Sequence, residues 1–197
     1  MSNELIKREN GIWQWNSAFN NPNKLMSDIL LKKWKPYNNN GGGSTLIGRD
    51  TIVLENEKAY NQILDLYLKC LQQYIHENNL DITTDNLGIG RWLVREYAAG
   101  SEMSAHIDHY SYVKDGEHAV TPKFTIILYI NDDYEGGEIH FLNDNITIKP
   151  KAGSVVIFPS NLLHEVKAVI SGNRYMTQSY IYEKPFSYYQ EKIGKNK

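Results

Sequence analysis

The sequence predicts an α+β protein in which a double-stranded β-helix, or jelly roll, is supported by helices that precede it. Three observations point to this fold class. Apolar residues recur at helical spacing in roughly the first eighty residues, short segments rich in β-formers follow, and turn residues separate those segments. A chain with helices first and strands afterwards is typical of an α+β fold whose helices cover one sheet.

The size of the chain favours one domain. It has 197 residues, of which 41% are hydrophobic, and this is enough for one well-filled core and too little to favour two. We therefore expect a single domain over residues 1–197, with helical support over about 20–80 and the jelly-roll core over about 88–182.

Two helices are expected in the supporting part. Asn21 followed by Pro22 is a favourable helix start. The apolar residues after it recur at helical spacing: Leu25, Met26, Ile29, Leu30 and Trp34. A longer helix is expected from about Asn56 to Asn79, where the apolar residues form a single stripe: Tyr60, Ile63, Leu64, Tyr67, Leu71, Tyr74 and Ile75. Such a stripe more often packs against its own domain than against a partner, so we interpret it as core.

Strands are expected throughout the second half of the chain. The segment Phe124 to Ile130 is apolar on both faces, as expected if one face meets a helix layer and the other lines an enclosed barrel. A jelly roll or sandwich is favoured by the number and shortness of the predicted strands. They are Gly90–Tyr97, Ser104–Tyr110, Lys123–Ile130, Glu138–Leu142, Ile146–Lys149, Ser154–Phe158, Leu163–Ala168 and Arg174–Tyr182.

The charges of the chain nearly balance, which disfavours nucleic acid as a partner. Lys and Arg number 21 against 23 Asp and Glu, a formal net charge of −2. No apolar run approaches the roughly 18 residues of a membrane span, and no apolar core of a secretory signal is present. Cys70 is the only cysteine, so we expect a buried thiol and no intrachain disulfide. These features predict a cytoplasmic protein without a membrane partner.

His106 and Asp108, with His164 far downstream, supply two imidazoles and one carboxylate for a single metal ion. Residues i and i+2 of an extended segment point to the same face, so His106 and Asp108 can present ligand atoms side by side while His164 completes the set from another strand. This donor set suits iron(II) and leaves about three adjacent sites for a chelating cosubstrate and dioxygen. Arg174 begins a segment rich in β-formers, from which its guanidinium could grip a distal carboxylate.

Further motifs lie between the metal-binding segments in a definite order. Lys123–Leu142 reads KFTIILYINDDYEGGEIHFL, and Ala152–Pro159 reads AGSVVIFP. Together with the HxD motif, the distal histidine and Arg174, this series resembles the iron(II)- and 2-oxoglutarate-dependent oxygenases, and within them the prolyl 4-hydroxylase-like group. The resemblance runs from about Trp92 to Tyr182, and the N-terminal half matches only in outline.

The resemblance implies roles for individual residues. The two histidines and Asp108 match the family's metal ligands, and Arg174 matches the basic residue that pairs with the far carboxylate of 2-oxoglutarate. Tyr97 is similar to a tyrosine that hydrogen-bonds the cosubstrate near the metal, and Tyr129 to one beside the arginine; core packing is the alternative for both. The implied cofactors are iron(II), 2-oxoglutarate and dioxygen, with ascorbate as an additional one.

The implied reaction is hydroxylation of an unactivated C–H bond with release of succinate and carbon dioxide. A prolyl residue in a peptide or protein is the leading substrate, because this is the commonest activity of the group, and a free amino acid or small metabolite is the alternative. Aspartate at position 108 favours hydroxylation, since halogenases carry alanine or glycine there. Nucleic-acid-dealkylating relatives carry a second arginine six residues after the first, where this chain has Tyr180.

Two interpretations without this chemistry also stay open. One is a non-catalytic jelly-roll binding module, and the other is a cupin-like metalloenzyme that works without 2-oxoglutarate and has no need of Arg174. If the chain is an oxygenase, Asn38–Ser44 and Tyr110–Thr121 are candidate lids over the substrate. The first of these segments reads NNNGGGS, and a plain surface connector is its alternative.

Overall fold

The computed structural model describes residues 4–41, 43–52, 58–90, 93–108 and 121–183. Its helices are α1 (Pro22–Leu30) and α2 (Lys58–Glu77), with the 3-10 turns η1 (Glu9–Gly11) and η2 (Thr84–Asn86). Its strands are β1 (Leu5–Lys7), β2 (Trp13–Trp15), β3 (Lys35–Gly41), β4 (Ser44–Ile52), β5 (Leu87–Ile89), β6 (Leu93–Tyr97), β7 (Met103–His106), β8 (Pro122–Tyr129), β9 (Glu135–Gly136), β10 (Ile139–Phe141), β11 (Ile146–Ile148), β12 (Val155–Pro159), β13 (His164–Val166), β14 (Val169–Ser171) and β15 (Arg174–Glu183).

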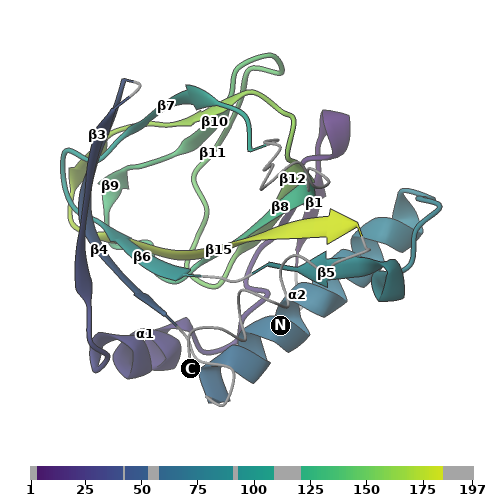
Figure 1. Ribbon diagram of the computed structural model, residues 1–197, viewed down its shortest axis with the longest axis horizontal. Coiled ribbons are helices and arrows are strands. Elements are labelled where there is room, and N and C mark those ends of the chain that lie inside the picture. The colour runs from purple at the N-terminus through teal and green to yellow at the C-terminus, as the bar shows by residue number, and fades with distance from the viewer. Residues whose placement is uncertain (1–3, 42, 53–57, 91–92, 109–120, 184–197) are drawn as a thin grey trace, which may run out of the picture.

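The strands form a jelly roll, which confirms the predicted fold class (Figure 1). The larger sheet has the order β1-β2-β12-β8-β15-β6-β4-β3, with β5 paired to β15. The smaller sheet has the order β11-β10-β13-β7, and β14 pairs with β9. In Figure 1 the smaller sheet curves over one face of the larger sheet, while α1 and α2 lie against the other. Side chains on the inner face of the larger sheet therefore point toward the smaller sheet.

All the strand regions expected after Leu80 contain a strand, although several strands end earlier than predicted and β7 differs most. The expected strand Ser104–Tyr110 corresponds to β7, which ends at His106, so Asp108 lies in a bend beyond the strand. The carboxylate of Asp108 accepts hydrogen bonds from side chains of other strands, and these hold it in place without strand pairing. The short strands β5, β9 and β14 were not expected.

The N-terminal part differs more from the prediction. Helix α1 is present, but it ends at Leu30 and Trp34 lies beyond it. The segment Asn38–Ser44, predicted to be a loop, belongs to the β3–β4 hairpin, so that prediction was wrong and the helical support also contains two strands. Strand β3 pairs with β4 from Lys35 to Gly41, and this pairing supplies backbone hydrogen bonds that an Asn- and Gly-rich composition does not foretell. The other candidate lid, Tyr110–Thr121, lies outside the described residues apart from Thr121.

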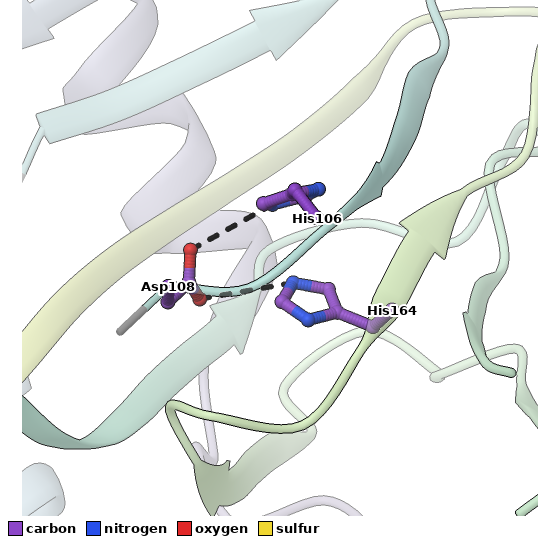
Figure 2. A group of neighbouring side chains, drawn as sticks. All are labelled: His106, Asp108 and His164. Atoms are coloured by element: carbon purple, nitrogen blue, oxygen red, sulfur yellow. Dashed lines mark ion pairs between the residues drawn. The ribbon is translucent and has the colours of Figure 1, made fainter. Parts of the chain in front are cut away.

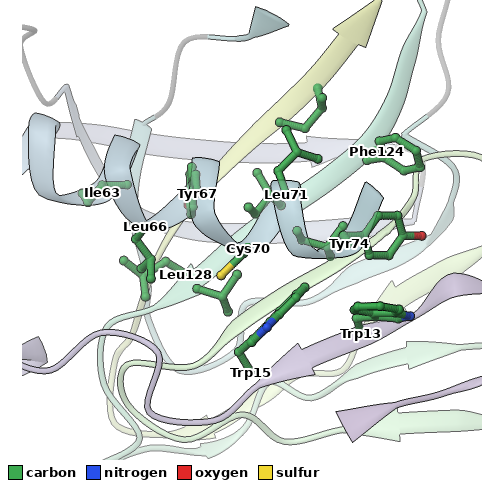
Figure 3. Packing of buried hydrophobic residues seen from close by; sticks show 14 of the residues in the cluster. Trp13, Trp15, Ile63, Leu66, Tyr67, Cys70, Leu71, Tyr74, Phe124 and Leu128 are labelled. Carbon is green, nitrogen blue, oxygen red and sulfur yellow. The ribbon is translucent and has the colours of Figure 1, made fainter. Parts of the chain in front are cut away.

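Helix α2 packs its predicted stripe against the outer face of the larger sheet (Figure 3). Ile63, Tyr67 and Leu71 are at most 1% exposed, and Cys70 is buried among them as expected. The Tyr67 hydroxyl donates a hydrogen bond of 2.9 Å to the carbonyl oxygen of Thr177 on β15, in the middle of the sheet. The helix thus fixes β15, the strand that begins with Arg174. None of the described helices is both long and apolar enough to cross a membrane.

Removing the Tyr67 hydroxyl tests this link between helix and sheet. We expect Tyr67→Phe to lower the free energy of unfolding by about 1–3 kcal/mol, because a buried hydrogen bond is lost without a new contact. Urea denaturation of the variant and the wild type gives the difference. Leu31→Ala is a suitable control, since Leu31 is 87% exposed and its loss should change stability by less than about 0.5 kcal/mol. Equal stability of the two variants would contradict the expectation.

Candidate metal centre

The structure brings His106, Asp108 and His164 together between the two sheets (Figure 2). His106 ends β7, His164 begins β13, and these two residues are direct partners in the pairing of the two strands. Nε2 of His106 lies 3.7 Å from Oδ1 of Asp108, and Nε2 of His164 lies 3.7 Å from Oδ2. All three ligand atoms lie within 4.8 Å of one another, so one metal ion could be bound by all three.

Both imidazoles are oriented by backbone carbonyls. Nδ1 of His106 lies 2.8 Å from the carbonyl oxygen of Ser104, and Nδ1 of His164 lies 2.9 Å from that of Leu162. A carbonyl only accepts, so each Nδ1 carries a proton, and in the neutral form of each ring the lone pair of Nε2 is directed to the centre. Burial lowers the pKa of His164 although Asp108 opposes the shift, and this favours the neutral form that binds metals.

Asp108 is held by hydroxyl groups from the larger sheet. Oγ1 of Thr125 donates to Oδ2 at 2.8 Å and lies 3.0 Å from Oγ of Ser160, and the Tyr180 hydroxyl donates to Oδ1 at 3.3 Å. Nε2 of Gln178 in turn donates to the Tyr180 hydroxyl at 3.0 Å. Both carboxylate oxygens are therefore oriented before any ligand binds, which limits the reorganisation that metal binding requires.

These supporting residues were not expected from the sequence. Thr125 shares strand parity with Tyr129, which was expected beside the arginine, and this parity is the one signal that could have indicated its position. Tyr180 was singled out only as the residue that replaces an arginine. Ser160 carries no sequence signal, because its contact depends on the pairing of β12 with β8.

The centre is closed on one side and partly open on another. The side chains of Asp108 and His164 are 5% and 4% exposed, whereas that of His106 is 30% exposed. Phe158 and Phe141 pack against the His164 ring, with centroid distances of 4.9 and 5.8 Å. Aromatic rings thus exclude water on the His164 side, and the side of His106 is the accessible one.

Arg174 forms a second polar cluster in the same interior. It is 1% exposed, and its guanidinium carbon lies 5.2 Å from the ring centroid of Tyr97 and 5.1 Å from that of Tyr129. A narrow pocket between the sheets reaches Arg174 and Tyr97; its lining is Leu46, Tyr97, Ser101, Glu102, Met103, Val166, Val169 and Arg174. Tyr97 was expected to bind the cosubstrate near the metal, and the structure places its ring beside Arg174.

Three buried polar atoms of this second cluster have no hydrogen-bond partner within the described part of the chain. They are Nε of Arg174 and the hydroxyls of Tyr129 and Tyr134. Buried donors left without an acceptor are costly, so this group fits an anionic ligand that the protein binds. By strand alternation Arg174 lies on the same face of β15 as Tyr180, which contacts Asp108. The cluster around Arg174 and the triad therefore lie on the same face of the larger sheet.

A model of the 2OG-Fe(II) oxygenase superfamily matches residues 92–182, which contain the triad, Arg174 and all strands from β6 to β14. This part of the chain is similar to that superfamily. The name of that superfamily implies iron(II), 2-oxoglutarate and dioxygen, and the residues of this chain fit the first two: two imidazoles with one carboxylate suit iron(II), and the buried cluster around Arg174 suits a carboxylate.

Several proteins that match part of the chain are PKHD-type hydroxylases. A PKHD-type hydroxylase of Prochlorococcus marinus strain NATL2A is 38% identical over 85 residues, which cover 42% of this chain and 37% of that protein. The chain therefore spans little more than a third of this relative's length.

Solved structures share the fold at low sequence identity. The viral collagen prolyl hydroxylase of Paramecium Bursaria Chlorella virus-1 has a TM-score of 0.68 at 18% identity, covering 89% of this chain and 98% of that one. A Trichoplax adhaerens prolyl hydroxylase, in complex with a hypoxia inducible factor peptide fragment, has a TM-score of 0.59 at 17% identity, covering 96% of this chain and 89% of that one. HygX of Streptomyces hygroscopicus, with nickel, 2-oxoglutarate and hygromycin B bound, has a TM-score of 0.60 at 12% identity, covering 92% of this chain and 88% of that one.

Proposed function

We propose that this chain is an iron(II)- and 2-oxoglutarate-dependent dioxygenase that hydroxylates an unactivated C–H bond, with a prolyl residue of a peptide or protein as substrate and succinate and carbon dioxide as coproducts. The observation that carries the proposal is the pairing of two sites in one interior. The triad supplies a metal face with open positions, and the cluster around Arg174 supplies buried donors that lack an acceptor among the described residues. A 2-oxo dicarboxylate can engage both sites at once.

In this proposal the roles of the residues follow from their contacts. His106, Asp108 and His164 would hold the iron through Nε2, a carboxylate oxygen and Nε2, while the carbonyls of Ser104 and Leu162 keep the imidazoles in the required tautomer. When bound, iron(II) and 2-oxoglutarate would together activate dioxygen, which is the oxidant for the C–H bond. The protein itself contributes geometry and a water-poor cavity.

Arg174 and Tyr129 would bind the far carboxylate of 2-oxoglutarate. The guanidinium offers charge-assisted hydrogen bonds, and the phenol keeps its proton because burial raises its pKa, although the nearby guanidinium charge opposes this. Anchoring this end orients the 2-oxo acid end toward the triad. The substrate would approach from the side of His106, the more exposed of the three metal ligands.

Two kinds of substrate have support among the structural neighbours. The prolyl hydroxylases, one of them bound to a peptide fragment, favour a prolyl residue in a peptide or protein. HygX, whose structure holds hygromycin B, favours a small molecule as the second candidate. Because these neighbours are under 20% identical to the chain, the choice between the two candidates belongs to experiment. Ascorbate as an accessory cofactor and a cytoplasmic location stay predictions.

Anaerobic titration of the iron(II)-loaded protein with 2-oxoglutarate tests the cofactor chemistry. We expect a weak visible charge-transfer band that grows to saturation, because bidentate chelation of iron(II) by a 2-oxo acid produces it. A band would justify a screen of peptides and then small molecules for products that have gained one oxygen atom. Well-bound iron without a band would instead favour a cupin-like enzyme that does not use 2-oxoglutarate.

A second measurement separates an enzyme from a binding module. In air, an oxygenase of this kind is expected to convert a trace of 2-oxoglutarate to succinate even without its substrate, and a non-catalytic jelly roll is not. Succinate formation that requires iron(II) would support the enzyme, and its complete absence in iron-loaded protein would count against it.

A further inference from the structure

Tyr134 is a buried tyrosine that the proposed mechanism has not yet used. It lies in the turn between β8 and β9, is 5% exposed, and its hydroxyl has no hydrogen-bond partner within the described ranges. A buried phenol normally finds a partner for its O–H. Tyr134 lies beside Arg174, so its unpaired hydroxyl belongs to the same cluster as Nε of Arg174 and the hydroxyl of Tyr129.

Two glycines bring Tyr134 against Arg174. A Cβ at Gly137 would lie 3.0 Å from Cδ of Arg174 and 3.3 Å from Cε2 of Tyr134, so the two side chains meet where residue 137 has none. A Cβ at Gly172 would lie 3.2 Å from Cβ of Tyr134 and 2.8 Å from the carbonyl oxygen of Asp133. Both glycines have positive φ, of 67° and 76°, which other residues adopt at a cost. The backbone is therefore shaped to hold the phenol at the arginine.

The cluster offers phenolic and guanidinium donors. The charge of Glu138 also acts on Tyr134, and Glu102 is among the residues that line the pocket at Arg174. Burial raises the pKa of Tyr134 to about 12, against the opposing effect of the Arg174 charge, so the phenol keeps its proton at neutral pH. Tyr129 keeps its proton for the same reason. Tyr97 differs, because its hydroxyl lies 3.4 Å from Nη1 of Arg95 and so already has a polar neighbour. The cluster thus offers two phenolic O–H groups and one guanidinium, a set that complements the lone pairs of a single carboxylate.

We propose that Tyr134 is a third donor to the far carboxylate of 2-oxoglutarate, alongside Arg174 and Tyr129, and that it makes the pocket selective for 2-oxo acids that carry this second carboxylate. The inference rests on the proposed function, since it assigns a residue to the same cosubstrate pocket. The inference assigns Tyr134 to this pocket, a residue that belongs neither to the metal-binding motif nor to the segment that begins with Arg174. The role is binding and positioning of the cosubstrate, not chemistry at the iron.

The test compares two ligands that differ only at the far end. 2-Oxoglutarate and 2-oxopentanoate share the chelating 2-oxo acid, but the second ends in a methyl group. Each is titrated anaerobically into iron(II)-loaded wild type and Tyr134→Phe, with the charge-transfer band as readout. We expect Tyr134→Phe to weaken the binding of 2-oxoglutarate about 10-fold to 100-fold, which is the usual effect of losing a hydrogen bond to a charged group. The affinity for 2-oxopentanoate should stay unchanged.

Controls separate a binding role from a structural one. Tyr67→Phe removes another buried phenolic hydroxyl, on the outer face of the sheet, and should leave both affinities unchanged. If Tyr134→Phe weakens the binding of both ligands equally, the residue only supports the fold of the site and the inference is wrong. It is also wrong if 2-oxoglutarate binds wild type and variant equally. Failure of wild type to bind 2-oxoglutarate at all would overturn the proposed function itself, which is a different outcome.

Discussion

Replacing Asp108 by alanine is expected to abolish stable iron(II) binding. The substitution removes the one anionic ligand of the triad and leaves two neutral imidazoles, which hold a hard divalent ion weakly. It also removes the acceptor of the hydrogen bonds from Thr125 and Tyr180. We expect the affinity for iron(II) to fall by about 1000-fold or more, equivalent to several kcal/mol, and succinate formation to fall with it. Anaerobic metal titration followed by metal analysis of the desalted protein measures the loss.

Tyr180→Phe is the matched control for this prediction. It removes a hydroxyl that donates to Asp108 at 3.3 Å but keeps the carboxylate, so iron(II) should still bind, with an affinity reduced by about 10-fold to 100-fold at most. Circular dichroism shows whether each variant keeps its fold. If a folded Asp108→Ala protein retained one equivalent of iron with wild-type affinity, the assignment of Asp108 as a ligand would be refuted.

The proximity of the three candidate metal ligands could be predicted from the sequence because its signals are local or ordered along the chain. His106 and Asp108 are two residues apart, and the distal histidine follows a glycine turn and an apolar strand. The structure then brings the three side chains within 4.8 Å through the direct pairing of His106 with His164. Even here the prediction was incomplete, since Asp108 reaches the centre from a bend and not from the strand.

The supporting residues could not be predicted in this way, because their roles exist only once strands pair. Thr125 and Tyr180 are partners in the register of β8 and β15, and only this pairing places both hydroxyls at Asp108. Tyr134 reaches Arg174 through turns whose glycines adopt positive φ. Hydrophobic periodicity contains no information on such contacts, whereas it does predict α2, whose stripe repeats over five turns at helical spacing.

The β3–β4 hairpin shows why local composition failed in the N-terminal part. Gly48 of β4 lies opposite Tyr97 of β6, and a Cβ there would lie only 1.8 Å from the carbonyl oxygen of Glu96. Glycine is usually a weak strand former, but here its missing side chain is what lets the two strands approach. Arg49 then forms an ion pair with Glu96, which also accepts a hydrogen bond of 2.6 Å from the Tyr175 hydroxyl. Tertiary contacts therefore override the propensities of the segment.

Replacing Arg174 by alanine is expected to remove 2-oxoglutarate binding while sparing the metal. The guanidinium is 1% exposed and is the positive charge in the cluster with Tyr129 and Tyr134. Without it, a carboxylate would be buried against two neutral phenols, and the cost of desolvating its charge would not be offset. Loss of one member of such a buried pair costs about 3–5 kcal/mol, so we expect 2-oxoglutarate to bind at least about 100-fold more weakly.

The decisive comparison is between iron binding and cosubstrate binding in the same Arg174→Ala protein. Iron(II) should bind as in wild type, because Arg174 has no contact with the triad among the described residues, whereas the charge-transfer titration should shift strongly. Arg174→Lys keeps a charge but loses the planar fork, and we expect it to recover part of the lost affinity. A cupin-like enzyme has no need for this charge, so unchanged turnover in a folded Arg174→Ala protein would favour that alternative and exclude the cosubstrate pocket proposed here.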